Sequence, residues 1–260
     1  MERDVLCSSC TGSGKTASFL IPMLNGLMSA HFARGSVGGM SSSYHGACCP
    51  DTLIIAPTRE LSVQIGGEAS KFCHCTPFRV AVIHGGEFTM RPQIVDLARG
   101  ADVLVATPGR LLDFLGVKIV SVESVVQLVI DEADVFFQSS VGLADLLRLL
   151  VDRHGLKPCG DRQTMLYSAS LSAEIRTLVR EFLYNPITVQ MGVPGSAATT
   201  VTQFVVAVTP STRFQALLLV FRDPGSFLVF LNSKASVDKL CGDLAAGGCR
   251  CAALHGGLDQ

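Results

Sequence analysis

Five short apolar runs, each followed by a polar or glycine-containing motif, constrain the fold of this chain most strongly. They cover residues 52–56, 79–83, 102–106, 127–130 and 163–167. Continuous apolar runs of this length are typical of parallel strands that are covered on both faces. Segments with helical patterns follow four of these runs, at about 60–72, 90–99, 111–115 and 172–183. Strands that alternate with helices predict an α/β fold with a doubly wound, mostly parallel sheet.

A glycine-rich segment near the start of the chain, Cys10–Thr16, predicts a phosphate-binding loop between a short strand and a helix. Glycines let backbone N–H groups turn inward, and a helix N-terminus adds partial positive charge. Lys15 is placed to reach the outer phosphates of a nucleotide, and the Thr16 hydroxyl to bind Mg²⁺. The strict pattern has glycine where Ser9 stands, so a simple turn before a surface helix is the alternative. The predicted cofactor-binding residues are Thr11, Gly12, Ser13, Gly14, Lys15 and Thr16.

A phosphate loop needs an acidic partner, and the run 127–130 ends in one, Asp131-Glu132. Asp131 is suited to hold Mg²⁺ through water, because this ion keeps much of its hydration in proteins. Glu132 is the candidate to orient and deprotonate an attacking water. The alternative is that both carboxylates merely cap a helix N-terminus, where negative charge is stabilising. The sequence thus predicts Lys15, Asp131 and Glu132 as catalytic residues, and Thr16 and Asp131 as metal ligands.

Composition limits the classes of protein to which the chain can belong. Of its 260 residues, 48% are hydrophobic and 17% are charged, which suits a globular protein of one or two domains. The net charge of −1 provides no general basic surface, so any nucleic-acid contact must be local. No apolar run approaches the length of a membrane helix, and the N-terminus has no secretory pattern. We expect an intracellular protein, in the cytoplasm, nucleus or nucleolus.

A break in the pattern predicts two domains. Residues 192–200 are small residues with glycine and proline, which mark a linker after a first domain of residues 1–191. Beyond it the alternation restarts over residues 201–260. Strands are expected at 201–208, 227–231 and 250–254, and helices at 211–222 and 233–246. Sixty residues are few for a doubly wound domain, so we expect a truncated second domain.

Two further features invite functional interpretation. Residues 34–50 are rich in glycine and serine, which favours a surface insertion over a binding segment. The ten cysteines include the pair Cys7 and Cys10 and the sequence Cys73-His74-Cys75, which suggest zinc or a disulfide. Cysteine is also a common small core residue in reducing compartments, and we expect reduced thiols.

Together these motifs resemble the DEAD-box family of ATP-dependent RNA helicases. The resemblance covers nearly the whole chain, and the motifs occur in the family's order. They are Thr11–Thr16, Pro57–Leu61 (PTREL), Gly85-Gly86, Thr107–Arg110 (TPGR), Asp131–Asp134 (DEAD) and Ser168–Ser170 (SAS). The resemblance implies two RecA-like lobes that close over ATP, Mg²⁺ and single-stranded RNA.

The resemblance also implies a set of residues that couple hydrolysis to strand separation. Ser168 and Ser170 are expected to bond back to Asp134. The family usually has threonine where Ser170 stands, and serine keeps the hydroxyl group. Capping of the helix that starts near Ser172 is compatible with this role.

The RNA-binding residues implied by the resemblance are Thr58, Arg59, Gly86, Thr107 and Arg110. Hydroxyl, amide and guanidinium groups suit phosphates and sugars, and such contacts carry no base sequence. Surface ion pairing is the alternative for the two arginines.

This sequence departs from the family pattern in three places. Ser9 and Cys10 stand where alanine and glutamine are usual. The upstream adenine-recognition segment and the later motifs of the second lobe, including an arginine finger, have no counterpart in residues 1–260. We therefore expect this chain to hydrolyse ATP very slowly and not to unwind duplexes. The rival interpretations are a non-catalytic module that binds RNA or a partner, and a DNA-directed motor, which the DEAD and PTREL motifs disfavour.

Overall fold

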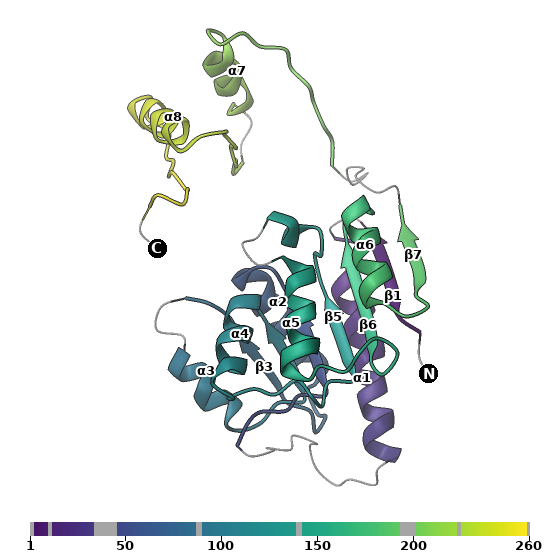
Figure 1. Ribbon diagram of the computed structural model, residues 1–260. Coiled ribbons are helices and arrows are strands. Elements are labelled where there is room, and N and C mark those ends of the chain that lie inside the picture. Colours follow the sequence, from purple (N-terminus) through teal and green to yellow (C-terminus); the bar gives the residue numbers. More distant parts are fainter. Residues whose placement is uncertain are drawn as a thin grey trace. The chain divides into compact units, whose positions relative to one another are not determined.

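The computed structural model describes residues 3–9, 12–33, 46–86, 90–138, 142–192, 201–222 and 225–258 (Figure 1). The chain separates into two compact units, residues 1–201 and 202–260. Most of the predicted linker, residues 193–200, lies outside the described residues.

The first unit is built on a seven-stranded parallel sheet with the order β3-β4-β2-β5-β6-β1-β7. The strands are β1 (Val5–Ser9), β2 (Thr52–Ile55), β3 (Val80–Ile83), β4 (Val103–Ala106), β5 (Gln127–Ile130), β6 (Gln163–Ser168) and β7 (Ile187–Met191). Five of them confirm the apolar runs, and β1 confirms the strand expected before the phosphate loop. β7 was not predicted. All of its residues are exposed at the edge of the sheet, so it lacks the continuous apolar pattern of a central strand.

Helices cover both faces of this sheet, which confirms the predicted doubly wound α/β fold (Figure 1). They are α1 (Lys15–Ala33), α2 (Arg59–Phe72), α3 (Met90–Leu97), α4 (Pro108–Gly116), α5 (Leu143–His154) and α6 (Ala173–Phe182). Successive side chains of a strand point to opposite faces, and β2 shows the result. Leu53 and Ile55 pack into the core under α3 to α6, whereas Ile54 packs with the buried residues of α1 and α2.

Helix α5 was missing from the sequence prediction although it has a clear helical pattern. Its buried residues are Leu143, Leu146, Leu147 and Leu150, at the spacing of one helical face. A short 3₁₀ helix, Val135–Gln138, precedes it. The helix ends at Gly155, whose φ of 70° is the left-handed conformation that commonly terminates helices.

The prediction of a surface insertion over residues 34–50 is wrong for its last residues. Ala47, Cys48 and Cys49 are buried. The Cys48 amide donates to the Ile119 carbonyl at 2.8 Å, and Cys48 forms an isolated parallel bridge with Val120. This short pairing secures the segment to the turn after α4. Residues 34–45 lie outside the described residues.

The second unit contains two helices, α7 (Arg213–Val220) and α8 (Lys234–Ala246), both at predicted positions. The predicted strands 201–208, 227–231 and 250–254 are wrong, because the structure assigns no strand to these segments. A strand requires a hydrogen-bonded neighbour, and apolar residues such as Val205, Phe230 and Leu254 stay largely exposed here. The structure of the second unit therefore does not show the predicted second α/β domain.

Among the described residues, we find neither a helix that could span a membrane nor a cluster of side chains that could hold a metal. None of the described helices combines the length and apolar character needed to cross a membrane. The described cysteines are free thiols, and the described histidine, cysteine and acidic side chains form no cluster of three or more that could hold a metal.

Candidate nucleotide and RNA site

The sheet order divides the predicted site residues into two groups. Strands β5, β6 and β1 are neighbours, and the residues that follow them are the acidic motif, the serine motif and the phosphate loop. Strands β3, β4 and β2 form the other half, and the predicted RNA-binding residues follow these three. Because all seven strands are parallel, their carboxyl ends meet at one edge, where ligands bind in open α/β sheets.

The phosphate loop joins β1 to α1 and has the backbone that its glycines predict. Gly12 and Gly14 have φ values of 77° and 84°, which lie in the left-handed region. The Ser13 hydroxyl donates to the Ser9 hydroxyl at 2.9 Å, so the serine that departs from the strict pattern stabilises the loop. Thr11 and Cys10 lie outside the described residues.

Lys15 and Thr16 begin α1, as the phosphate-loop prediction requires. The Lys15 ammonium donates a hydrogen bond to the Ser9 carbonyl oxygen at 3.1 Å, across the loop. The Ser18 amide donates to the Gly14 carbonyl at 3.0 Å, which starts the helix directly after the loop. The cationic side chain and the helix N-terminus thus lie on the same short segment, which suits an anionic ligand.

The acidic partner lies at the end of β5. Asp131 is 3% exposed, and its amide donates to the Ile55 carbonyl at 3.1 Å, which continues the ladder with β2. Its Oδ1 accepts from the Glu132 amide at 2.9 Å. Burial raises the pKa of the Asp131 carboxyl, while the positive charge of Lys15 lowers it. The structure therefore brings the phosphate-loop lysine and the acidic motif together.

Glu132 follows in a left-handed backbone conformation, with φ of 50°. This conformation is uncommon for a residue other than glycine, and it frequently occurs at functional sites. The capping alternative receives no support, because the next helix is only the 3₁₀ turn Val135–Gln138. The bond that Asp131 accepts comes from its own neighbour rather than from a helix end.

Two residues that the sequence analysis did not single out lie beside this site. The Ser18 hydroxyl, in the first turns of α1, donates to the Tyr167 hydroxyl of β6 at 3.3 Å. Burial raises the pKa of Tyr167, and the charge of Asp131 contributes in the same direction. Tyr167 was recognised only as the end of an apolar run. A phenol inside such a run is the signal that a buried polar contact must be found.

The predicted coupling residues lie close together but bond differently from the expectation. Asp134 Oδ1 accepts from the backbone amide of Ala169 at 3.4 Å, between the two serines. The Ser168 hydroxyl is buried and accepts from the Ser170 amide at 3.3 Å. The predicted serine hydroxyl bonds to Asp134 are therefore replaced by one backbone bond. Ser172 is the N-cap of α6, as expected for a helix that starts near this residue.

The RNA half of the edge presents residues of several kinds. Thr58 is the N-cap of α2, and its hydroxyl accepts from the Leu61 amide at 3.2 Å, while Arg59 is exposed. Gly86 is exposed after β3 with φ of 129°, a conformation that favours glycine. Thr107 is the N-cap of α4 without a side-chain capping bond, and its amide donates to the Ile83 carbonyl at 3.0 Å.

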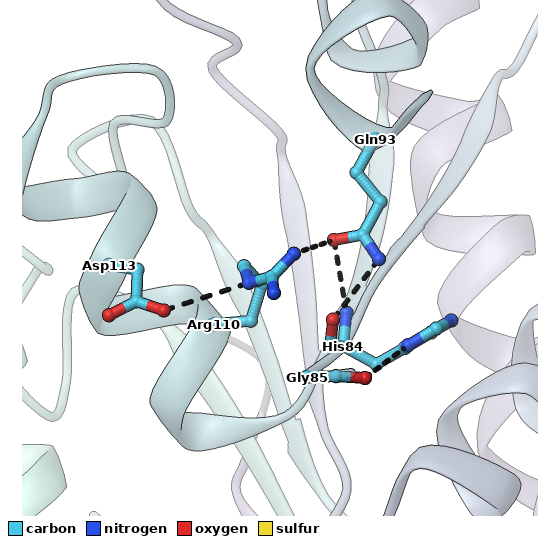
Figure 2. A network of polar contacts seen from close by, with 5 residues as sticks. All are labelled: His84, Gly85, Gln93, Arg110 and Asp113. Carbon is cyan, nitrogen blue, oxygen red and sulfur yellow. Dashed lines mark hydrogen bonds and ion pairs between the residues drawn. The ribbon is translucent and has the colours of Figure 1, made fainter. Parts of the chain in front are cut away.

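The family resemblance implies that Arg110 contacts the RNA backbone, but the structure buries its side chain. It is 8% exposed, and its Nη1 donates to Gln93 Oε1 at 3.1 Å (Figure 2). Its Nε lies 3.6 Å from Asp113 Oδ2, and its guanidinium carbon lies 5.4 Å from the centre of the Phe114 ring. The arginine is thus engaged inside the protein, because α4 turns its first-turn side chain toward α3 rather than outward.

The residues present fit a nucleotide with Mg²⁺. This ion is usually bound by one or two carboxylates together with substrate phosphates and water, not by a cage of several side chains. Asp131 and Thr16 provide that kind of partial donor set, and Gly12 and Gly14 have no atom within 4 Å of the positions where side chains would begin. Phosphates can therefore approach the backbone closely at the loop.

Comparisons with known proteins agree with this arrangement. The family model described as DEAD/DEAH box helicase matches residues 1–178. A probable ATP-dependent RNA helicase, ddx3, of Dictyostelium discoideum is 36% identical over 261 residues, which cover 100% of this chain and 36% of the relative. DEAD-box ATP-dependent RNA helicase 52A of Oryza sativa subsp. japonica is 38% identical over 269 residues, which cover 99% of this chain and 44% of the relative.

A solved structure gives the same result. The crystal structure of the yeast DEAD-box splicing factor Prp28 superposes with a TM-score of 0.65 and 28% identity, over 94% of this chain and 55% of that chain. The likeness agrees with a RecA-like α/β fold for the seven-stranded unit. The chain spans less than half the length of the two curated relatives that it matches.

Proposed function

Because this chain belongs to the DEAD-box family of ATP-dependent RNA helicases, we propose that it binds and hydrolyses ATP with Mg²⁺ and couples this to RNA binding and remodelling. The observation that carries the proposal is the proximity of Lys15 to Asp131, whose charges interact across the ends of β1 and β5, the two strands that flank β6. A lysine on a glycine loop and a buried carboxylate that senses its charge form the pair that a metal-bound triphosphate requires.

Each residue of the proposed nucleotide site has a distinct task. The loop amides of residues 11–14 and the Lys15 ammonium bind the phosphates, and Thr16 and Asp131 hold the metal. Bound Mg²⁺ would neutralise phosphate charge. Glu132, fixed by its left-handed backbone, orients a water and accepts its proton. Asp134 and the Ser168–Ser170 segment couple ATP hydrolysis to RNA strand separation, and the hydrogen bond from the Ala169 amide to Asp134 joins them.

We propose that RNA lies along the other half of the carboxyl edge, beside β3, β4 and β2. Exposed Arg59 and Gly86 would contact phosphates directly, and Thr58 and Thr107 would contribute from the helix starts that follow β2 and β4. Arg110 supports this surface from inside, through its bond to Gln93. Contacts of this kind recognise the backbone and leave the identity of the RNA open.

The similarity to the curated relatives extends over the whole chain, which supports assigning residues 1–191 to the first helicase lobe and residues 201–260 to the second. The proposal implies an intracellular protein, because ATP and RNA are both used inside the cell. The non-catalytic alternative, a module that binds RNA or a partner, makes a different prediction in one experiment.

That experiment measures phosphate release from ATP by the 260-residue chain, with and without Mg²⁺ and single-stranded RNA. We expect slow release that requires Mg²⁺, rises with RNA and falls by about a hundredfold or more in Glu132→Gln, the scale of losing a general base. Glu123→Gln, a change at an exposed glutamate that precedes β5 while the motif follows it, is the control and keeps the parent rate. Equal rates in the parent and Glu132→Gln would reject the assigned site and favour the non-catalytic alternative.

A further inference from the structure

Gln93 joins two segments that are separate in the sequence and lie side by side in the structure. Its Nε2 donates to the His84 carbonyl at 3.1 Å, and its Oε1 accepts from the His84 amide at 3.3 Å. The same Oε1 accepts from Arg110 Nη1 at 3.1 Å. Figure 2 shows the amide of Gln93 between the backbone of His84 and the guanidinium of Arg110.

The two segments held in this way carry residues that we assign to the RNA surface. His84 directly follows β3 and lies two residues before Gly86. Arg110 lies in the first turn of α4, three residues after Thr107. The Thr107 amide already joins the end of β3 through the Ile83 carbonyl at 3.0 Å. Gln93 adds a second connection from α3, so the end of β3 is bonded both to the start of α4 and to α3.

The burial of these side chains makes the connection rigid. Gln93 and Arg110 are each 8% exposed, so water competes weakly for their hydrogen bonds. Gln93 uses both atoms of its amide, and the guanidinium is held from another side by Asp113. Three hydrogen bonds thus restrain the Gln93 side chain. It therefore transmits its position to the backbone that it contacts.

We propose that Gln93 is a positioning residue for RNA binding, which sets the backbone of the Gly85-Gly86 turn against the start of α4 so that both meet one RNA strand. This inference rests on the proposed function. RNA phosphates along a strand have a regular spacing, and binding is tightest when the protein groups that contact them are already in place. Without this connection each segment could still bind RNA, but the two would no longer be positioned to contact the same strand together.

A volume-conserving substitution separates this role from simple packing. Gln93→Met keeps the length and most of the volume of the side chain but removes both hydrogen-bonding ends. Gln93→Glu keeps an acceptor for Arg110 and the His84 amide, loses the donor to the His84 carbonyl and adds a negative charge beside Arg110. The matched control is Gln127→Met, because Gln127 is also buried and its Oε1 accepts from the Thr52 hydroxyl at 3.0 Å. Gln127 begins β5, at the amino ends of the strands, whereas Gln93 contacts His84 just after the carboxyl end of β3.

The measurement is the Kd of the 260-residue chain for a fluorescein-labelled oligouridine, by anisotropy with Mg²⁺ and a non-hydrolysable ATP analogue. The Kd for a fluorescent ATP analogue and the melting temperature are recorded in parallel. For Gln93→Met we expect RNA binding about tenfold weaker, the scale of one or two lost hydrogen bonds. ATP-analogue binding stays at the parent value. Gln93→Glu falls between the parent and Gln93→Met, and Gln127→Met lowers the melting temperature with no change in RNA affinity.

Four results would overturn the inference, and they differ from one another. Parent-like RNA affinity in a folded Gln93→Met would reject the positioning role alone. Equal losses of RNA and ATP binding in Gln93→Met and Gln127→Met would show that both act only through stability. If the parent chain itself does not bind the oligouridine, the proposed RNA function fails, and the role of Gln93 fails with it. Should Gln93→Met not fold, an RNA affinity of Gln93→Glu equal to that of the parent would also reject the inference.

Discussion

The Lys15 ammonium donates a hydrogen bond to the carbonyl oxygen of Ser9 at 3.1 Å. Ser9 ends β1 and Lys15 begins α1, so this bond spans the whole phosphate loop. The lysine is thereby held over the loop, next to the Asp131 carboxyl whose pKa it lowers. Nucleotide phosphates would replace a neutral carbonyl acceptor with a charged one, which is the stronger partner for an ammonium group.

Lys15→Ala is therefore expected to weaken ATP binding by about 10- to 100-fold, the scale of a charge-assisted hydrogen bond. Folding should change little, because the side chain is only half-buried and loses one bond to a carbonyl. Titration with a fluorescent ATP analogue measures the affinity, and thermal melting checks the fold. Lys71→Ala removes an exposed lysine that pairs with Glu68 on α2, and it should bind the analogue like the parent.

Asp131→Asn is expected to separate stability from activity. Burial disfavours the ionised Asp131 carboxyl, and asparagine has nearly the same shape without the charge. Asn can still accept from the Glu132 amide. We expect a higher melting temperature without ligand, together with loss of Mg²⁺-dependent ATP hydrolysis. A lower melting temperature would contradict the view that this carboxylate is retained for function at a cost in stability.

Two adjacent glycines on α2 are expected to respond in opposite directions to alanine. A Cβ on Gly66 would overlap Val82 Cγ2 of β3, whereas one on Gly67 would meet no atom within 4 Å. Gly66→Ala should cost about 1–3 kcal/mol in the free energy of unfolding through overpacking. Gly67→Ala should add about 0.5–1 kcal/mol, because alanine favours the helix. Urea unfolding of both variants measures the difference, and equal effects would contradict the close approach of α2 to β3.

The Cys48 thiol is expected to make the free energy of unfolding depend on pH in the alkaline range. Burial raises the pKa of its thiol from the ordinary 9.0 to about 11. Above pH 9 the unfolded thiol loses its proton while the folded one keeps it, so its contribution to stability is complete below that pH. The contribution is lost as the pH rises toward 11, by about 2 kcal/mol.

Urea unfolding under reducing conditions at about pH 8 and about pH 10.5 tests this linkage. Relative to the parent, Cys48→Ala should be least stable at the lower pH and should recover at the higher one. Cys75→Ala, at an exposed cysteine, is the control and should show no such recovery. If the parent and Cys48→Ala differed in the free energy of unfolding by the same amount at both pH values, the burial of this thiol would be contradicted.

Much of the first unit could be predicted from local patterns. Continuous runs such as Leu53–Ala56 mark strands because their side chains must be covered on both faces. The phosphate loop was recognisable because glycine is needed where φ is positive, as at Gly12 and Gly14. The strand β7 escaped detection because an exposed edge strand has no such apolar signature. The strands expected after residue 200 failed for another reason, since a strand exists only through its neighbours.

The sequence alone determined which chemical groups follow which strands, because residue types and their order are local properties. It therefore predicts Lys15, Asp131 and Glu132 as catalytic residues, and it identified the family to which the chain belongs. The tertiary structure decided which strand ends are neighbours, and hence that the proposed nucleotide and RNA residues occupy two halves of one edge. It also decided that Arg110 turns inward to Gln93 and that Asp134 bonds to the amide of Ala169. These contacts join residues distant in the chain, and only the packing of helices on the sheet determines which of them meet.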